Sequence, residues 1–107
     1  PAGQRFEGLL DHIRRNLQAP LDVDTLARIA CMSPRNFSRC FTAETGVTPA
    51  RAVERLRVEA AAAALESGNR PVQQVARDCG FGDPERMRRA FLRTLGMPPS
   101  ARRRWPG

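Results

Sequence analysis

One segment of the chain occurs twice, and this internal repeat limits the fold more than any other feature. Residues 33–49, SPRNFSRCFTAETGVTP, align with residues 83–99, DPERMRRAFLRTLGMPP, at a shift of 50 positions. The residues just before them match at a shift of 49, because Leu-Ala-Arg at 26–28 aligns with Val-Ala-Arg at 75–77. Two copies of one supersecondary unit within 107 residues predict two small, similar subdomains.

Both copies carry the signals that begin and end a helix. Ser33 and Asp83 are residue types that cap helix N-termini, and each is followed by a proline, which suits the first helical position. A glycine, common just after the last helical residue, closes each copy. We therefore expect helices over residues 34–45 and 84–95. Each should follow a short helix and a tight turn, and the second turn contains one additional residue.

The N-terminal part of the chain shows helical periodicity as well. Apolar residues spaced at i, i+3, i+4, i+7 and i+11 predict an amphipathic helix over residues 5–18. Its apolar stripe consists of Phe6, Leu9, Leu10, Ile13 and Leu17. A short second helix is expected over residues 25–31, capped by Asp22 or Asp24. Its inward residues are predicted to be Leu26, Ile29 and Ala30.

The second half continues in the same way. An alanine-rich stretch, residues 49–68, has high helix propensity and predicts a long linker helix. A fifth helix should begin after Pro71, with Val72, Val75 and Ala76 facing inward, and a last helical turn should lead toward Trp105. The predicted fold is all-α and homeodomain-like, with about seven helices in two helix-turn-helix subdomains joined by the linker helix.

A short helix joined by a tight turn to a longer, two-faced helix is typical of helix-turn-helix proteins, whose second helix enters the DNA major groove. At 100° per residue, the polar faces comprise Arg35, Ser38, Arg39 and Thr42 in the first copy and Glu85, Arg88, Arg89 and Leu92 in the second. A solvated face more often pairs Glu with Lys. Arginines beside short hydrogen-bonding groups match base edges better. This favours a DNA reader over a plain helical hairpin.

The distribution of charge agrees with a polyanionic partner. The formal net charge is +7, and all 18 basic residues are arginines. Residues 1–50 hold 6 arginines and 5 acids, whereas residues 51–107 hold 12 arginines and 6 acids. The all-arginine usage also follows from a GC-rich genome, so the position of the charge is the more informative observation.

Other classes of function find little support. Cys31, Cys40 and Cys79 are far apart, and the single histidine, His12, lies on another segment, so we expect no metal site. No nucleophile stands in a catalytic motif, and Gly80-Phe81-Gly82 lacks the strand and third glycine of a dinucleotide loop. We therefore expect no enzymatic activity and no cofactor. No apolar run is long enough to span a membrane, which predicts a cytoplasmic protein.

Taken in order, these segments resemble the DNA-binding domain of AraC/XylS-type bacterial transcription regulators. The similarity covers nearly the whole chain, through LARIACMSPRNFSRCFTAETGVTP, RLRVEAAAAALESG and VQQVARDCGFGDPERMRRAFLRTLGMPPSARRRW. The segments RNF and PERMRRAF are most similar to the sequences of the subgroup with a glutamine-amidotransferase-like N-terminal domain. The resemblance implies a DNA-binding domain over 1–107, divided into subdomains at 5–48 and 69–106 around the linker helix.

The resemblance also implies which residues face DNA. Carried over by position, the base-facing residues are Arg35, Ser38 and Arg39 in the first copy and Glu85, Arg86 and Arg89 in the second. Together with the polar faces of the helical wheel, the full set expected to contact DNA is Arg35, Asn36, Ser38, Arg39, Thr42, Glu85, Arg86, Arg88 and Arg89. In the second copy the helical wheel favours Arg88 where the family pattern favours Arg86, and one of the two is expected to contact phosphate. Glu85 stands where family members commonly have a neutral polar residue, so it either reads cytosine or moves the helix slightly off the phosphates.

Several partners follow from the same resemblance. Double-stranded DNA is the expected ligand, read in two adjacent major grooves, and RNA polymerase is a frequent further partner of the family. Because the chain begins at Pro1 without a methionine, we expect an N-terminal effector or dimerisation domain in a longer protein. The alternative function is a helical protein-interaction or RNA-associated module whose basic surface attracts partners nonspecifically.

Overall fold

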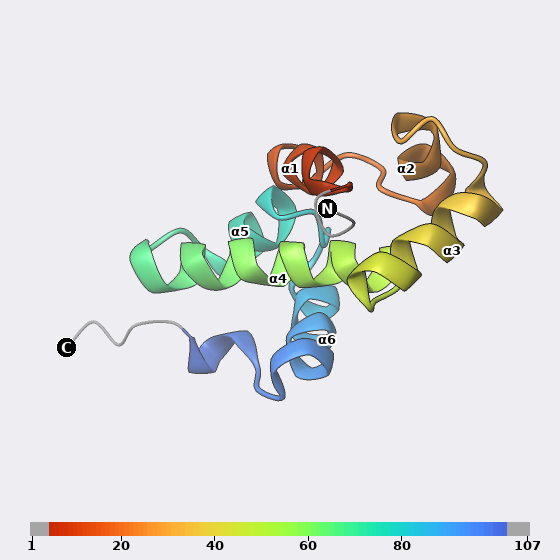
Figure 1. The fold of residues 1–107 in the computed structure, drawn as a ribbon. Coiled ribbons are helices and arrows are strands. Elements are labelled where there is room, and N and C mark those ends of the chain that lie inside the picture. Colours follow the sequence, from red (N-terminus) through yellow and green to blue (C-terminus); the bar gives the residue numbers. More distant parts are fainter. Residues whose placement is uncertain (1–4, 103–107) are drawn as a thin grey trace. The chain divides into compact units, whose positions relative to one another are not determined.

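The computed structural model describes residues 5–102 and is all-α, as predicted: that part contains six α-helices, one 3₁₀ turn and no strand. The expected contribution of Trp105 lies outside the described residues. The helices are α1 (Glu7–Arg15), α2 (Val23–Ile29), α3 (Pro34–Thr45), α4 (Pro49–Ser67), α5 (Val72–Asp78), α6 (Pro84–Leu95) and the turn η2 (Pro99–Ala101) (Figure 1). The chain divides into two compact units, Pro1–Val53 and Glu54–Gly107, so that α4 begins in the first and continues into the second.

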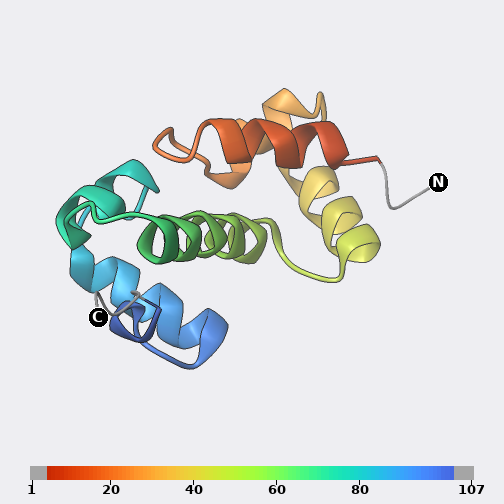
Figure 2. The same cartoon turned by 90° about the vertical axis from the view of Figure 1, so that its left-hand side faces the viewer.

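The first unit is built around three phenylalanines. Phe6 lies just before α1, and its ring centroid is 5.8 Å from that of Phe37 and 5.2 Å from that of Phe41, both on α3. Ile13 and Leu26 are each only 1% exposed and complete the core from α1 and α2. The apolar face of α3 is thereby fixed against α1 and α2. The backbones of these three helices can be followed in Figure 2.

The second unit has a continuous core formed by one face each of α4, α5 and α6. Its most deeply buried large side chains are Val58, Leu65, Val75, Met87 and Phe91, each at most 1% exposed. Alanines fill the remaining space along α4, where small side chains let the neighbouring helices approach closely. The apolar face of α6 is buried here, and the polar face is left for solvent or a ligand.

The predicted caps are confirmed. The side chain of Ser33 accepts a hydrogen bond from the backbone N–H of Asn36 at 3.3 Å, and that of Asp83 accepts from the N–H of Arg86 at 2.8 Å. Both helices end at a glycine in the left-handed conformation, with φ of 81° at Gly46 and 73° at Gly96. Residues 34–45 and 84–95 are therefore helical as predicted.

The two turns that precede α3 and α6 share one backbone pattern. In the first turn, the N–H of Met32 donates to the carbonyl of Ala27, five residues earlier, at 2.9 Å. In the second turn, the N–H of Phe81 donates to the carbonyl of Ala76 at the same distance. Such turns require a left-handed residue, which is Gly80 in the second turn, with φ of 90°, and Cys31 in the first, with φ of 60°. The two tight turns thus begin alike, and the second continues with its additional residue, Gly82, which is also left-handed with φ of 91°.

Three details of the sequence prediction were wrong. Helix α1 is shorter than 5–18, because the amide of Asn16 donates to the carbonyl of His12 at 2.8 Å and ends the helix. Helix α2 begins two residues before Thr25, since Asp22 is its cap, and it ends at Ile29. Ile29 and Val72, both expected inside, are each 41% exposed. A seven-residue helix makes too few turns for every periodic apolar position to reach the core.

Candidate nucleic-acid interface

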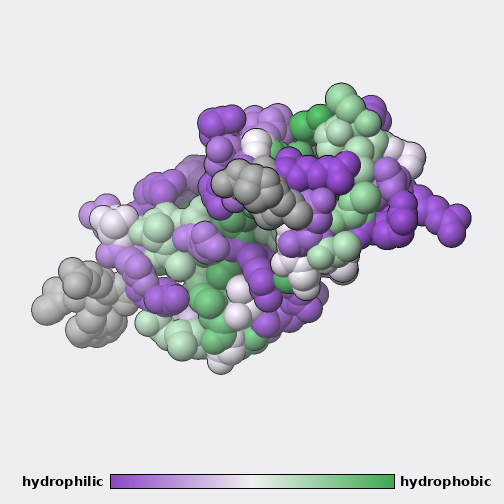
Figure 3. Space-filling view, viewed as in Figure 1, coloured by the Kyte–Doolittle hydropathy of each residue, from purple (hydrophilic) through white to green (hydrophobic). Residues whose placement is uncertain are grey.

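The polar face of α3 is anchored from behind and open in front. Phe37 and Phe41 hold the inner face, while Arg35, Arg39 and Thr42 are exposed and Asn36 and Ser38 are half-buried. Figure 3 shows hydrophilic side chains over the end at which α3 begins. The face is uncrowded and rich in hydrogen-bond donors, which suits it to an acceptor-rich ligand.

Within this face Asn36 organises Arg39. Nη2 of Arg39 donates to Oδ1 of Asn36 at 2.6 Å, one helical turn away, and the Sγ of Cys40 lies 3.6 Å from the same oxygen. Arg35, in contrast, forms no ion pair with any residue in the described range 5–102. The two arginines thus differ: Arg39 is held by a neutral amide, and Arg35 is available as a full positive charge.

The polar face of α6 carries a different arrangement, centred on a carboxylate. Both Nε and Nη2 of Arg88 donate to Glu85, at 2.9 and 2.7 Å, and Nε of Arg89 donates to the same carboxylate at 3.1 Å. Arg86 lies on the other side of the helix start, where its Nε is 3.7 Å from Oδ2 of Asp83. The side chains remain accessible, since that of Arg86 is 74% exposed and that of Arg89 is 62% exposed.

The arginines stabilise the charged form of the carboxylate. Hydrogen bonds first from Arg88 and then from Arg89 lower the pKa of Glu85 from 4.5 to about 2. The hydrogen bond between Glu85 and Arg88 also raises the pKa of Arg88. Glu85, Arg88 and Arg89 together therefore carry one net positive charge at neutral pH, in place of the two that the arginines alone would carry.

Two ion pairs between distant parts of the sequence fix the ends of these helices. Nη2 of Arg93 on α6 lies 2.6 Å from Oε2 of Glu54 on α4, and the pair raises the pKa of Arg93. In the first unit, Nη1 of Arg5 lies 3.2 Å from Oε1 of Glu44 on α3. Sequence reasoning missed both pairs, because partners 39 positions apart share no periodic signal.

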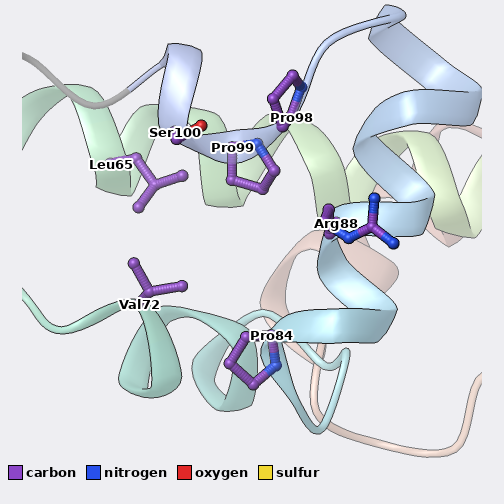
Figure 4. A pocket seen from close by; sticks show the side chains of 7 residues that line it. All are labelled: Leu65, Val72, Pro84, Arg88, Pro98, Pro99 and Ser100. Atoms are coloured by element: carbon purple, nitrogen blue, oxygen red, sulfur yellow. The ribbon is translucent and has the colours of Figure 1, made fainter.

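An apolar groove borders the polar face of α6. It has a volume of about 390 Å³, and Figure 4 shows Leu65 and Val72 facing one another across it, with Pro84 and Pro99 nearby. Arg88 lines its edge through its aliphatic stem. The stem therefore has an apolar surface to lie against, while its guanidinium remains with Glu85.

Among residues 5–102 no cluster of three or more His, Cys, Asp or Glu side chains could hold a metal ion. Burial raises the pKa of the Cys79 thiol, which therefore stays neutral, and burial lowers the pKa of Arg57. No helix in the described part of the chain is long and apolar enough to cross a bilayer.

Comparison with known proteins assigns the family. A family described as a helix-turn-helix domain matches residues 26–104, most of the chain. The chain belongs to this family and is of the AraC type, a class of DNA-binding domains found in transcription regulators.

Individual relatives are consistent with this assignment. The chain is 46% identical over 82 residues to the HTH-type transcriptional regulator Rv1931c of Mycobacterium tuberculosis. This match covers 77% of this chain and 32% of that protein. It is 38% identical, with a TM-score of 0.78, to the DNA-binding domain of the global transcriptional factor AdpA, solved in complex with a target DNA; the match covers 94% of this chain and 87% of that one.

A more distant structure confirms the fold alone. An AraC-type transcriptional regulator from Chromobacterium violaceum superposes with a TM-score of 0.84 at 22% identity, covering 96% of this chain and 95% of that one. The chain spans about a third of the length of the first curated relatives that it matches, between 32% and 36%.

Proposed function

We propose that this chain binds double-stranded DNA sequence-specifically and is the DNA-binding part of a bacterial transcription regulator. The observation that carries the proposal is the repeated pairing of a buried apolar face with an exposed, donor-rich face on α3 and α6. Each of these helices follows a short helix and a tight turn, which is the arrangement that presents a recognition helix to the major groove. The AdpA domain, a 38% identical neighbour, was solved with a target DNA.

In the first recognition helix, α3, the proposed DNA contacts are Arg35, Asn36, Ser38, Arg39 and Thr42. Arg35 and Arg39 are suited to the O6 and N7 acceptors of guanine or to phosphates, because a guanidinium offers two parallel donors. Ser38 and Thr42 supply adaptable hydroxyl groups. Asn36 holds Arg39 through a 2.6 Å hydrogen bond and so limits the directions in which it can reach.

In the second recognition helix, α6, the proposed contacts are Glu85, Arg86, Arg88 and Arg89. Arg86 suits a phosphate, because its side chain is 74% exposed and its Nε lies 3.7 Å from Oδ2 of Asp83, which is longer than a hydrogen bond. The ion pairs of Arg88 and Arg89 with Glu85 place those three side chains together as a unit.

For the whole protein we propose the organisation typical of a regulator. Residues 5–48 and 69–106 form the two DNA-reading subdomains, and 49–68 form the linker helix between them. An N-terminal effector or dimerisation domain, of the glutamine-amidotransferase-like kind, and contact with RNA polymerase belong to this proposal, as does a cytoplasmic location. The domain acts by binding and catalyses no reaction.

Selection of sites from a randomised duplex pool at physiological salt tests the proposal. We expect enrichment of two unlike short boxes about one helical turn apart. Arg39→Ala and Arg89→Ala should each relax the preference within one box, by roughly 5- to 150-fold at the affected base pair. The matched control is Arg14→Ala, which removes one exposed arginine from α1 and should leave both preferences intact. A basic module without sequence specificity would show equal, salt-sensitive losses and no enriched box.

A further inference from the structure

We propose that Glu85 is a specificity-determining residue that assigns different tasks to two arginines: its carboxylate holds Arg88 through Nε and Nη2 and Arg89 through Nε alone, which leaves the outer donors of Arg89 for a guanine. This inference rests on the proposed function and identifies Arg89 as the residue of the second recognition helix that reads a base.

The donor inventory supports the division. A guanidinium has five N–H donors, on Nε, Nη1 and Nη2. In Arg88 two of the five donors, on Nε and Nη2, are engaged by Glu85, so two hydrogen bonds fix the plane of its guanidinium against the carboxylate. In Arg89 only Nε is engaged, and Nη1 and Nη2 make no hydrogen bond to any other residue in the described range 5–102. The pair Nη1 and Nη2 can then approach O6 and N7 of guanine together.

The surroundings of the two arginines also leave Arg89 more accessible than Arg88. The stem of Arg88 lies along the apolar groove with Leu65, Val72 and Pro84, and its side chain is 49% exposed. The side chain of Arg89 is 62% exposed. Arg88 therefore borders an apolar surface and pairs with Glu85 through two nitrogens, whereas Arg89 pairs through one nitrogen and is more exposed.

The position of Glu85 on the helix makes the arrangement stable without DNA. Glu85 is the second residue of α6, one turn before Arg88 and Arg89, which is the i,i+3 and i,i+4 spacing at which helical side chains meet. A carboxylate in the first turn also interacts favourably with the positive end of the helix dipole. The carboxylate thus orients Arg89 before binding, which reduces the entropy lost when the arginine contacts a base.

The test measures base preference separately from affinity. On the site selected by the unaltered chain, each base pair of the second box is replaced in turn, and binding is measured for the unaltered chain, Glu85→Gln, Arg88→Ala and Arg89→Ala. We expect one guanine whose replacement weakens binding of the unaltered chain roughly 5- to 150-fold. Arg89→Ala should abolish that preference, and Glu85→Gln should reduce it at least threefold. Arg88→Ala should retain it while reducing the salt slope by about one.

Two controls separate orientation from charge. Glu59→Gln removes one exposed acidic charge from α4 and should strengthen binding to all sequences equally, without a change in preference. In the DNA-free chain, the NMR signals of the Arg88 and Arg89 Nε–H groups should shift toward solvated values in Glu85→Gln but not in Glu59→Gln.

The outcomes distinguish this inference from the proposed function. If the unaltered chain selects no sequence, the proposed function fails, and the inference fails with it. If it selects a site but Glu85→Gln keeps the full guanine preference, or gains affinity only as Glu59→Gln does, then DNA reading stands and the role of Glu85 is refuted. A preference that depends on Arg88 in place of Arg89 would also overturn the inference.

Discussion

The two recognition helices have the same backbone design and differ most at one position. The repeat aligns Arg35 on α3 with Glu85 on α6, so a cation in one helix corresponds to a carboxylate in the other. On α3 the arginines act separately, and Arg39 is held by the amide of Asn36. On α6 three charged side chains form a connected group. The comparison shows how one scaffold can carry two readers: the buried face sets the helix, and the exposed face alone sets the chemistry.

The largest expected effect concerns the buried faces. Phe41→Ala and Phe91→Ala remove equivalent side chains that are 1% and 0% exposed, and each should lower the free energy of unfolding of its own unit by about 3–5 kcal/mol. Hydrogen exchange resolved by residue can locate the loss: Phe41→Ala should expose amides of α1 to α3, and Phe91→Ala those of α5 and α6. Equal loss of protection throughout the chain by either variant would contradict the expectation that each side chain stabilises its own unit.

A smaller effect separates the two N-caps. Ser33→Ala and Asp83→Ala each remove one side-chain acceptor from a backbone N–H, which costs about 1 kcal/mol. Asp83→Ala should lower the free energy of unfolding more than Ser33→Ala does, because the charge of Asp83 also interacts with the helix dipole. Chemical denaturation of the two variants measures the difference. An Asp83→Asn variant, which keeps the acceptor without the charge, should recover most of the stability and serves as the control.

The comparison also shows what the sequence could predict. The bounds of α3 and α6 followed from their proline, cap and glycine signals, because these depend on neighbours within a turn. The exposure of Ile29 and Val72 did not follow from periodicity, since it depends on which neighbours happen to cover a short helix. The i,i+3 and i,i+4 spacing is enough to predict the pairing of Glu85 with Arg88 and Arg89, whereas the comparison with base chemistry alone suggests a base reader or a repulsive charge.

A further difference lies in the two turns. Cys31 occupies a left-handed conformation, with φ of 60°, at the position where the second copy has Gly80 with φ of 90°. Left-handed backbone costs a non-glycine residue about 1 kcal/mol, so Cys31→Gly should stabilise the first unit by up to that amount. Gly80→Ala should destabilise the second unit by a similar amount. Thermal unfolding of both variants tests the pair, and Cys31→Ala, which removes the thiol but keeps the strain, should leave stability nearly unchanged.

The smallest effect is the pH dependence of the α6 charge group. Because the pKa of Glu85 is lowered from 4.5 to about 2 in the folded chain, its ion pairs are fully present above pH 4.5 and are lost as the pH falls through 2. Carboxyl NMR should give a midpoint near 2 for Glu85, and Arg88→Ala should raise it, since the hydrogen bond from Arg88 is the largest cause of the shift. Between pH 5.5 and 8 the carboxylate does not titrate, so the affinity ratio of the unaltered chain to Glu85→Gln should stay constant. A ratio that changed across this range would show that Glu85 is protonated on DNA, and the carboxylate would then donate a proton to a base or phosphate rather than hold the two arginines.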